Sequence, residues 1–271
     1  MNEIPKIIHY CWFGKGEMPD ALKECMKSWE ILKQAGYEIK RWDESNCSFD
    51  ENDFVRKCFA EKKWGYIGDY YRAKALYEIG GVYLDTDVII QKPFDELLNQ
   101  EAFIGFSCDC ALCTAVVGAQ KGATFIKGIL EMYDTGKFYT EESFKNGKTQ
   151  AEYCDGKWAP SNEYWTWYTI CAYTNFVLNN KMQKLVNVTI YPKQYFELGS
   201  LIGSYYCRHT NYNSWREQNT SKNVLKKIKR KLERNTFCWI AIRTLINKRG
   251  EKNTSFYKYR KKQKSSPYFV R

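Results

Sequence analysis

The sequence predicts an α/β fold that ends in a basic helical tail. Strand-like and helix-like segments alternate from the N-terminus, the pattern of a sheet covered by helices. The 271 residues are 44% hydrophobic and 17% aromatic, which is enough to bury a sizeable core and a site within it. This composition, together with the lack of a repeat of fixed period, excludes the disordered, collagen-like and solenoid classes.

The net charge of +11 is unevenly distributed along the chain. Residues 222–271 contain 17 Lys or Arg against two Glu, a surplus of 15, so residues 1–221 carry a net charge of about −4. We therefore expect a globular unit over 1–221 and a basic, amphipathic helical extension over 222–271, with an apolar stripe between Val224 and Leu232. Any attraction to nucleic acid or anionic lipid belongs to this extension alone.

The first segments predict the opening of the sheet. Residues 4–13 are β-branched and aromatic and predict a buried strand that ends before Gly14. A helix is expected from Pro19, with Gly36 as its C-terminal stop, and a second strand over 37–42.

The following segments continue the alternation. Helices are expected over 53–62 and from Tyr66 to Gly80-Gly81, and then an apolar strand, 82–90, that two acids interrupt. Further strands are expected at 103–106, 115–119 and 188–191, and further helices at 123–133 and 237–247. The aromatic spacing over 158–173 fits a helix buried against the sheet.

Asp85 and Asp87 are the candidate metal ligands. In an extended chain their side chains point the same way, so their carboxylates converge. Two like charges held together need a cation, and oxygen ligands suit Mg²⁺ or Mn²⁺. Phosphate oxygens of a substrate usually complete the coordination shell of such an ion. The alternative is a solvated turn at a strand end.

Asp69 and Arg72 share one face of the helix that leads into the two acids. One interpretation is a surface salt bridge that contributes little to stability. The other is a functional pair, in which the carboxylate accepts hydrogen bonds from a sugar and the guanidinium stabilises negative charge.

The eleven cysteines are odd in number and scattered, and no signal peptide opens the chain, so we expect a reducing cytoplasmic location. Cys108, Cys110 and Cys113 could bind zinc, but no second pair or nearby histidine completes four ligands. We therefore expect small buried hydrophobic side chains there. Residues 237–246 are too short to cross a bilayer.

Three motifs together resemble one known family. They are residues 4–14 (IPKIIHYCWFG), 68–73 (GDYYRA) and 80–87 (GGVYLDTD). In this order they resemble glycosyltransferase family 32, over roughly the first 100 residues. The resemblance implies a GT-A type fold: a Rossmann-like nucleotide-binding sheet flanked by helices. It also implies a divalent metal on the Asp-x-Asp and a nucleotide-sugar donor used with retention of configuration.

The resemblance also implies roles for individual residues. Tyr10 and Trp12 would contact the donor nucleotide, with Trp12 packed on the base; plain core packing is the alternative for Trp12. Asp69 and Arg72 would grip the donor sugar. Asp87 would bind the metal directly, and Asp85 would reach the ribose or a metal-bound water.

Later residues resemble the closing segment of the same family, at Arg208-His209 and Ser214-Trp215. His209 would complete the metal shell and Trp215 would cover the donor, whereas a hydrogen-bonded surface histidine is the alternative for His209. His9, inside the first strand, is expected to be a buried structural residue.

No catalytic base stands out in the sequence. Asn162 and Glu163, just before the densest aromatic residues, are the best candidates for lining the reacting face. We expect most rings of 158–173 to lie in the core and one or two to reach the acceptor.

These observations favour a metal-dependent retaining glycosyltransferase with Mn²⁺ or Mg²⁺. It would move a hexose from a nucleotide-diphosphate sugar, a UDP-sugar before a GDP-sugar, to a capsular, exopolysaccharide or other surface glycan. One alternative is a nucleotidyltransferase or nucleotide-sugar pyrophosphorylase, for which Gly14-Lys15-Gly16 is a poor phosphate loop. Another is a noncatalytic basic protein that binds membrane or nucleic acid.

The basic extension has three interpretations. It could hold the protein at the inner face of the plasma membrane, near a lipid-linked glycan acceptor. It could instead be a solvated charged face. Nucleic-acid binding ranks last, although Trp239, Phe256, Tyr257 and Tyr259 are interleaved with the basic residues, because no known nucleic-acid module accompanies them.

Overall fold

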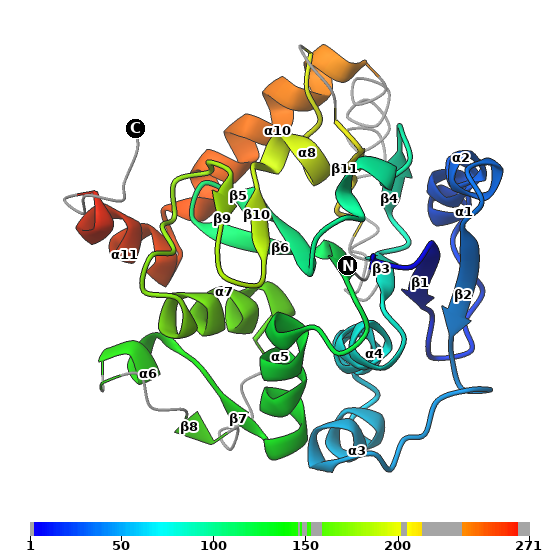
Figure 1. The fold of residues 1–271 in the computed structure, drawn as a ribbon, viewed down its shortest axis with the longest axis horizontal. Helices are drawn as coiled ribbons and strands as arrows, with labels where there is room; N and C mark the ends of the chain where they lie inside the picture. Colours follow the sequence, from blue (N-terminus) through cyan, green and yellow to red (C-terminus); the bar gives the residue numbers. More distant parts are fainter. Residues whose placement is uncertain are drawn as a thin grey trace, which may run out of the picture.

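A computed structural model describes residues 3–145, 147, 151–152, 159–201, 205–212 and 235–264. Its centre is a sheet of seven strands in the order β2-β1-β3-β6-β5-β10-β9 (Figure 1). The strands are β1 (Ile7–Cys11), β2 (Glu38–Trp42), β3 (Gly81–Leu84), β5 (Ala102–Cys108), β6 (Ala111–Ala119), β9 (Gln183–Lys184) and β10 (Thr189–Tyr191).

The sheet is mixed, with a parallel half at the N-terminal edge. Strand β1 pairs in parallel with both β2 and β3, while β6 runs antiparallel between β3 and β5. Strand β10 is parallel to β5, and the short β9 closes the edge in antiparallel fashion. The predicted α/β class, with a Rossmann-like sheet flanked by helices, is confirmed.

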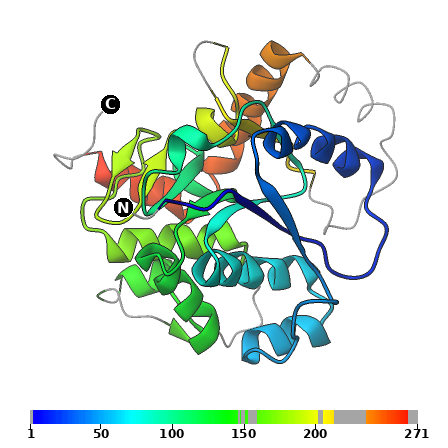
Figure 2. The ribbon, with the colours of Figure 1, turned by 45° about the vertical axis from the view of Figure 1, so that its right-hand side comes forward.

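Helices cover both faces of this sheet (Figures 1 and 2). They are α1 (Asp20–Lys27), α2 (Glu30–Gln34), α3 (Asp53–Ala60), α4 (Trp64–Glu78), α5 (Thr124–Thr135), α6 (Glu141–Lys145), α7 (Ser161–Ala172) and α8 (Lys193–Phe196), with a 3₁₀ turn at Asp95–Leu97. The single helix predicted between Pro19 and Gly36 is wrong, because it breaks at Ser28. The Ser28 hydroxyl donates to Cys25 O at 2.6 Å and accepts the Ile90 N–H at 2.8 Å.

Two hydrophobic clusters lie on opposite faces of the sheet, as strand alternation requires. On β3, Tyr83 belongs to the larger cluster, with α3, α4, α5 and α7, whereas Val82 and Leu84 belong to the smaller one, with α2 and α8. The aromatic helix α7 contributes buried Trp165 and Trp167 to the larger cluster, so the core interpretation of its rings is confirmed for these two.

The segment predicted as one strand over 82–90 is two strands in two different sheets. Strand β3 ends at Leu84, and β4 (Val88–Ile90) leaves the main sheet to pair with β11 (Cys207–His209). Another two-stranded sheet joins β7 (Lys137–Phe138) to β8 (Ala151–Glu152).

The described part of the C-terminal extension packs onto the globular unit. It forms α10 (Thr236–Glu251) and α11 (Ser255–Gln263), of which only the first was predicted. Trp239 and Phe256 are buried, and the Phe256 ring packs on Trp167 at a centroid distance of 5.1 Å. These aromatics therefore serve packing, which weakens the nucleic-acid interpretation. The apolar stripe between Val224 and Leu232 lies outside the described residues.

The helices within the described ranges include none that is long and apolar enough to cross a membrane.

Candidate functional site

A double glycine positions the strand that leads to the two acids. Gly80 and Gly81 have φ of +80° and +121°, a region that side chains disfavour. A Cβ on Gly81 would lie 2.5 Å from Ile7 O, so glycine also permits the close approach of β1. His9 lies in this contact, with Nε2 at 2.8 Å from Gly80 O and Nδ1 accepting from Trp42 at 3.1 Å. His9 is fully buried and structural, as predicted.

Asp85 and Asp87 occupy a turn rather than an extended strand. The Val88 N–H donates to Asp85 O at 3.1 Å, which closes the turn, and the Asp85 N–H donates to Ala115 O at 2.9 Å. The prediction that the two side chains point the same way because they lie on one extended strand is therefore wrong. The two carboxylates still come together, because the turn directs both toward β11.

His209 of β11 is the third member of this cluster. Ligand atoms of Asp85, Asp87 and His209 all lie within 4.8 Å of one another. His209 Nε2 is 3.0 Å from Asp87 Oδ1, and Asp87 Oδ2 accepts the Tyr212 N–H at 2.6 Å. Pairing of β4 with β11 places His209 opposite Val88 and so beside Asp87.

Glu197 holds the far side of the His209 ring. His209 Nδ1 lies 2.7 Å from Glu197 Oε2, and the other oxygen of Glu197 accepts from Asn211 at 2.7 Å. The Cys113 thiol also donates to Glu197 Oε2, at 3.2 Å. All of these groups are buried or nearly so, and the described geometry excludes a simple surface histidine at 209.

The charges of this cluster support one another. Burial alone would lower the pKa of His209, but the Asp87 and Glu197 carboxylates outweigh it and hold the pKa well above the usual value. In turn, the His209 ring lowers the pKa of both carboxyl groups despite their burial. When no metal is bound, a protonated ring acts as a counter-ion between the two carboxylates; a divalent cation that binds Nε2 takes the place of that proton and of its charge.

Arg72 connects the helix α4 to the acids. Its Nη2 donates to Asp85 Oδ1 at 2.8 Å, and its Nη1 lies 3.3 Å from Asp69 Oδ1 and 3.2 Å from the Ser161 hydroxyl. The guanidinium stacks over the Tyr83 ring at 4.4 Å and is 95% buried. The surface salt-bridge interpretation of Asp69 and Arg72 is therefore wrong.

Asp69 is a buried carboxyl group with an unusual pKa. Burial raises its pKa to about 6, and the nearby Arg72 only partly offsets this. A carboxylate in such a setting can accept hydrogen bonds from hydroxyl groups of a ligand that enters beside it.

Trp12 and Tyr10 lie at the carboxyl end of β1. Trp12 is partly exposed, lies outside both hydrophobic clusters and donates its Nε1–H to Gly16 O at 2.8 Å. Tyr10 packs edge-on against Trp29 at 5.5 Å, and Trp29 donates to Val88 O at 2.9 Å. Tyr10 is thus connected through Trp29 to the strand that follows the two acids. Trp12 belongs to neither hydrophobic cluster, so its half-buried ring does not serve core packing.

One predicted site residue, Glu163, is not brought to this cluster. Glu163 follows Ser161 by two positions on α7, a rotation of about 200°, so it faces away from Arg72. Its pKa is raised by burial and by Glu141 of α6. Its catalytic role stays a prediction, and Trp215 lies outside the described residues.

Sequence reasoning missed three partners of the site. Glu197, Ser161 and Cys113 come from segments far from the acids, and no local spacing links them. The one available signal was the position of Glu197 in an otherwise apolar run, YFEL, where an acid is expected to be buried and paired.

The residues of the cluster fit a divalent cation. Two carboxylates and one imidazole nitrogen are ligands that Mn²⁺ and Mg²⁺ accept, with Mn²⁺ the better match to imidazole. Glu197 on Nδ1 leaves Nε2 directed at Asp87, which is the outer-shell arrangement usual for a histidine that binds metal.

Fold and site together define a class of protein. Acids and a buried guanidinium at the carboxyl end of a strand in a Rossmann-like sheet are typical of α/β proteins that bind nucleotide diphosphates. Residues 19–104 match the family model described as the glycosyltransferase sugar-binding region containing DXD motif. This part of the chain is therefore similar to the sugar-binding region of the DXD glycosyltransferases, in agreement with the resemblance of the motifs at 68–73 and 80–87.

Individual relatives agree with this match. Inositol phosphoceramide mannosyltransferase 3 of Schizosaccharomyces pombe is 32% identical over 127 residues, which are 45% of this chain and 35% of the relative. Glucan organizing enzyme 1 of Cryptococcus neoformans var. grubii is 31% identical over 84 residues, 27% of this chain and 23% of the relative. This chain spans about a third or less of the length of these relatives. Among solved structures, PaToxG glycosyltransferase is similar with a TM-score of 0.40 and 14% identity, over 62% of this chain and 70% of that chain.

Proposed function

We propose that this chain is a metal-dependent glycosyltransferase that takes a hexose from a nucleotide-diphosphate sugar. The observation that carries the proposal is the convergence of Asp85, Asp87 and His209 within 4.8 Å, with Arg72 bonded to Asp85. The family match of residues 19–104 supports a sugar donor.

Each residue of the cluster has a role in this proposal. Asp87, His209 and Asp85 would hold Mn²⁺ or Mg²⁺, which when bound neutralises charge on the departing diphosphate. Arg72 is fixed beside the same acids and stabilises the same charge without having to reorganise. Asp69 accepts hydrogen bonds from the donor sugar, and Trp12 offers the accessible part of its ring to the base.

We propose a UDP-sugar before a GDP-sugar, retention of configuration, and a capsular, exopolysaccharide or other surface glycan as acceptor. The name of one relative, inositol phosphoceramide mannosyltransferase, favours a lipid-linked acceptor and places mannose among the sugars to test.

A thermal-shift screen of UDP- and GDP-sugars, with and without Mn²⁺, tests the donor and the metal together. A ligand that binds only the folded state raises the melting temperature. We expect a rise that needs both nucleotide and metal, and that Asp87→Asn abolishes. The matched control is Asp50→Asn, whose carboxylate is 82% exposed. A shift that persists without metal would contradict the site.

Product analysis separates this function from the alternatives. Slow release of free sugar from a nucleotide sugar, dependent on metal, supports a glycosyltransferase, whereas release of inorganic pyrophosphate supports a nucleotidyltransferase. A noncatalytic binder would release neither.

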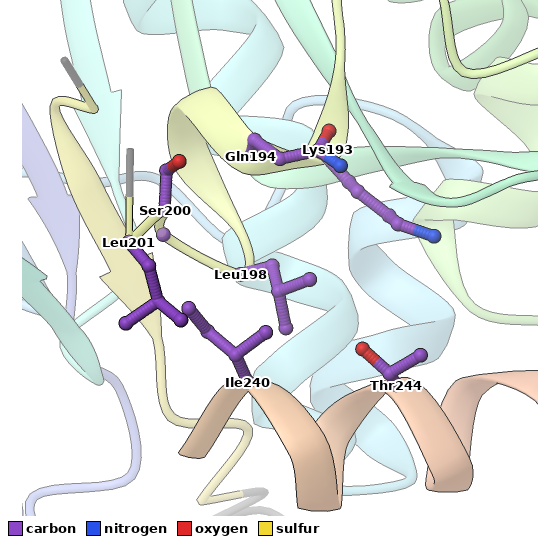
Figure 3. A pocket seen from close by; sticks show the side chains of 8 residues that line it. Lys193, Gln194, Leu198, Ser200, Leu201, Ile240 and Thr244 are labelled. Atoms are coloured by element: carbon purple, nitrogen blue, oxygen red, sulfur yellow. The ribbon is translucent and has the colours of Figure 1, made fainter. Parts of the chain in front are cut away.

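The outer face of α10 supports a peripheral position at the inner face of a membrane, with the protein in the cytoplasm. Phe237 and Leu245 are each 65% exposed there, beside exposed Lys248 and Lys252 on the same face. A pocket between α8 and α10 adjoins this face; Figure 3 shows Leu198, Leu201 and Ile240 together on one side of it. Apolar and basic side chains in this combination are typical of helices that lie on anionic lipid.

Co-sedimentation with vesicles tests this placement. We expect binding to phosphatidylcholine vesicles that contain phosphatidylglycerol, weak binding to neutral vesicles, and at least tenfold weaker binding of the double variant Phe237→Ser, Leu245→Ser. The control is Val186→Ser, a 96% exposed valine elsewhere on the chain. Equal binding to both vesicle types would contradict the proposal.

A further inference from the structure

A second cluster of metal-ligand atoms lies between the sheet and the C-terminal helices. Cys108 ends β5, Cys110 lies in the turn before β6, and Glu251 is the last residue of α10. The two sulfur atoms and a carboxylate oxygen of Glu251 lie within 4.8 Å of one another. This cluster shares no residue with the site of Asp85 and Asp87.

The separation of the two sulfur atoms matches a shared zinc ion. Cys108 Sγ and Cys110 Sγ are 3.7 Å apart. Two zinc–thiolate bonds of about 2.3 Å at a tetrahedral angle place their sulfurs about 3.8 Å apart. A disulfide would require about 2.05 Å, and both residues are free thiols.

Glu251 is a buried carboxylate in an unfavourable position. It is 6% exposed and lies at the C-terminal end of the 16-residue helix α10, where the helix dipole is negative. Its side chain accepts the Asp109 N–H at 2.7 Å, and no Lys or Arg of the described ranges pairs with it. A bound cation would remove the cost of burying this charge.

The side chains around the cluster carry a net negative charge that a divalent ion would balance. The Asp109 carboxylate contacts Lys193 Nζ at 2.5 Å and Arg260 Nη2 at 3.4 Å. Two thiolates and two carboxylates would therefore face only two cationic side chains. One divalent ion balances the remaining charge.

The three cysteines considered from the sequence, Cys108, Cys110 and Cys113, do not all lie on the same face of the sheet. Cys110 belongs to the hydrophobic cluster on one face and Cys113 to the cluster on the other. Glu251, 141 positions after Cys110, takes the place of Cys113, and Thr254 Oγ1 lies 3.7 Å from Cys110 Sγ. The candidate ligands in the structure are thus Cys108, Cys110 and Glu251 rather than the three cysteines.

We propose that Cys108, Cys110 and Glu251 bind one Zn²⁺ ion that fastens α10 to the β5–β6 turn, with water or the Thr254 hydroxyl as the fourth ligand. Thiolates select zinc over Mg²⁺ and Mn²⁺, so this site is independent of the proposed donor site.

Zinc analysis of the intact chain tests the proposal. Protein produced with zinc and dialysed should contain about one zinc ion per chain, counted with a chromogenic chelator after unfolding. Cys108→Ser and Glu251→Gln should lose most of it, whereas Cys113→Ser should keep it. Cobalt in place of zinc should give thiolate-to-cobalt absorption in the wild type and in Cys113→Ser, and none in Cys108→Ser.

The melting temperature of the wild-type protein tests the same site without a substitution that could itself disturb folding. Chelation should lower its melting temperature by several degrees, and Zn²⁺ should restore it while Mg²⁺ should not. Less than about 0.1 zinc ion per chain, with no response of the melting temperature to zinc, would overturn the proposal. Loss of zinc in Cys113→Ser alone would overturn it too, since the ion would then lie with Glu197 and His209.

Discussion

Glu197 fixes the ring of His209 through a hydrogen bond of 2.7 Å at Nδ1, and the opposite nitrogen then faces Asp87 at 3.0 Å. The two residues are twelve positions apart in the sequence, at the end of α8 and in β11. Because one ring nitrogen is committed to Glu197, the other is presented to the two acids in a single orientation.

The affinity for the metal should depend on this orientation of the His209 ring. Glu197→Gln should weaken Mn²⁺ binding about 10- to 100-fold, because the amide is a poorer acceptor for the imidazole N–H. Titration of the protein with Mn²⁺ measures the affinity. Glu96→Gln, at an exposed glutamate, should leave it unchanged. Unchanged affinity in Glu197→Gln would show that Glu197 plays no positioning role.

Arg72→Lys should retain the positive charge but lose the simultaneous contacts that the guanidinium makes with several side chains. A lysine ammonium cannot reach Asp69, Asp85 and Ser161 together as the guanidinium does. We expect kcat for donor hydrolysis to fall roughly 100- to 1,000-fold with a smaller change in KM. Arg56→Lys on the surface is the control. An unaltered kcat in a folded Arg72→Lys protein would remove Arg72 from the mechanism.

Asp69 should make stability depend on pH in a definite direction. Its pKa rises on folding from 3.8 to about 6, so the folded state binds the proton more tightly. The stability that this gives is fully present below pH 4 and is lost as pH rises to about 6. Asp69→Asn cannot lose it, so the variant should be more stable than the wild type by up to ~3 kcal/mol at pH 7.

Urea unfolding at several pH values measures this difference. The curves of stability against pH for wild type and Asp69→Asn should converge toward pH 4 and separate above it. Parallel curves would mean that Asp69 does not carry a raised pKa.

The C-terminal helix should stabilise the site as well as the fold. Trp239 of α10 donates from Nε1 to Leu198 O at 2.9 Å, next to Glu197. Trp239→Phe replaces the indole by a smaller aromatic ring and leaves the Leu198 carbonyl without its donor, and the lost hydrogen bond should cost about 1–3 kcal/mol. Chemical denaturation measures it, with exposed Lys248→Gln on the same helix as the control. We also expect the Mn²⁺ affinity of Trp239→Phe to fall. An unchanged Mn²⁺ affinity would show that Trp239 stabilises the fold but not the metal site.

Local patterns in the sequence determined much of this protein. Hydrophobic periodicity and glycine stops predicted β1, β2, α3, α4 and α10 to within a few residues, because these signals depend on neighbours along the chain. The Asp69 and Arg72 pair and the Asp-x-Asp were recognisable for the same reason, since each lies within one short motif.

The tertiary structure decided the partners. Glu197 meets His209, Ser161 meets Arg72 across 89 positions, and Cys113 lies on the opposite face of the sheet from Cys110. No local spacing encodes these contacts, because they depend on which strand pairs with which. The departure of β4 from the sheet to join β11 is such a pairing, and it places His209 beside the acids.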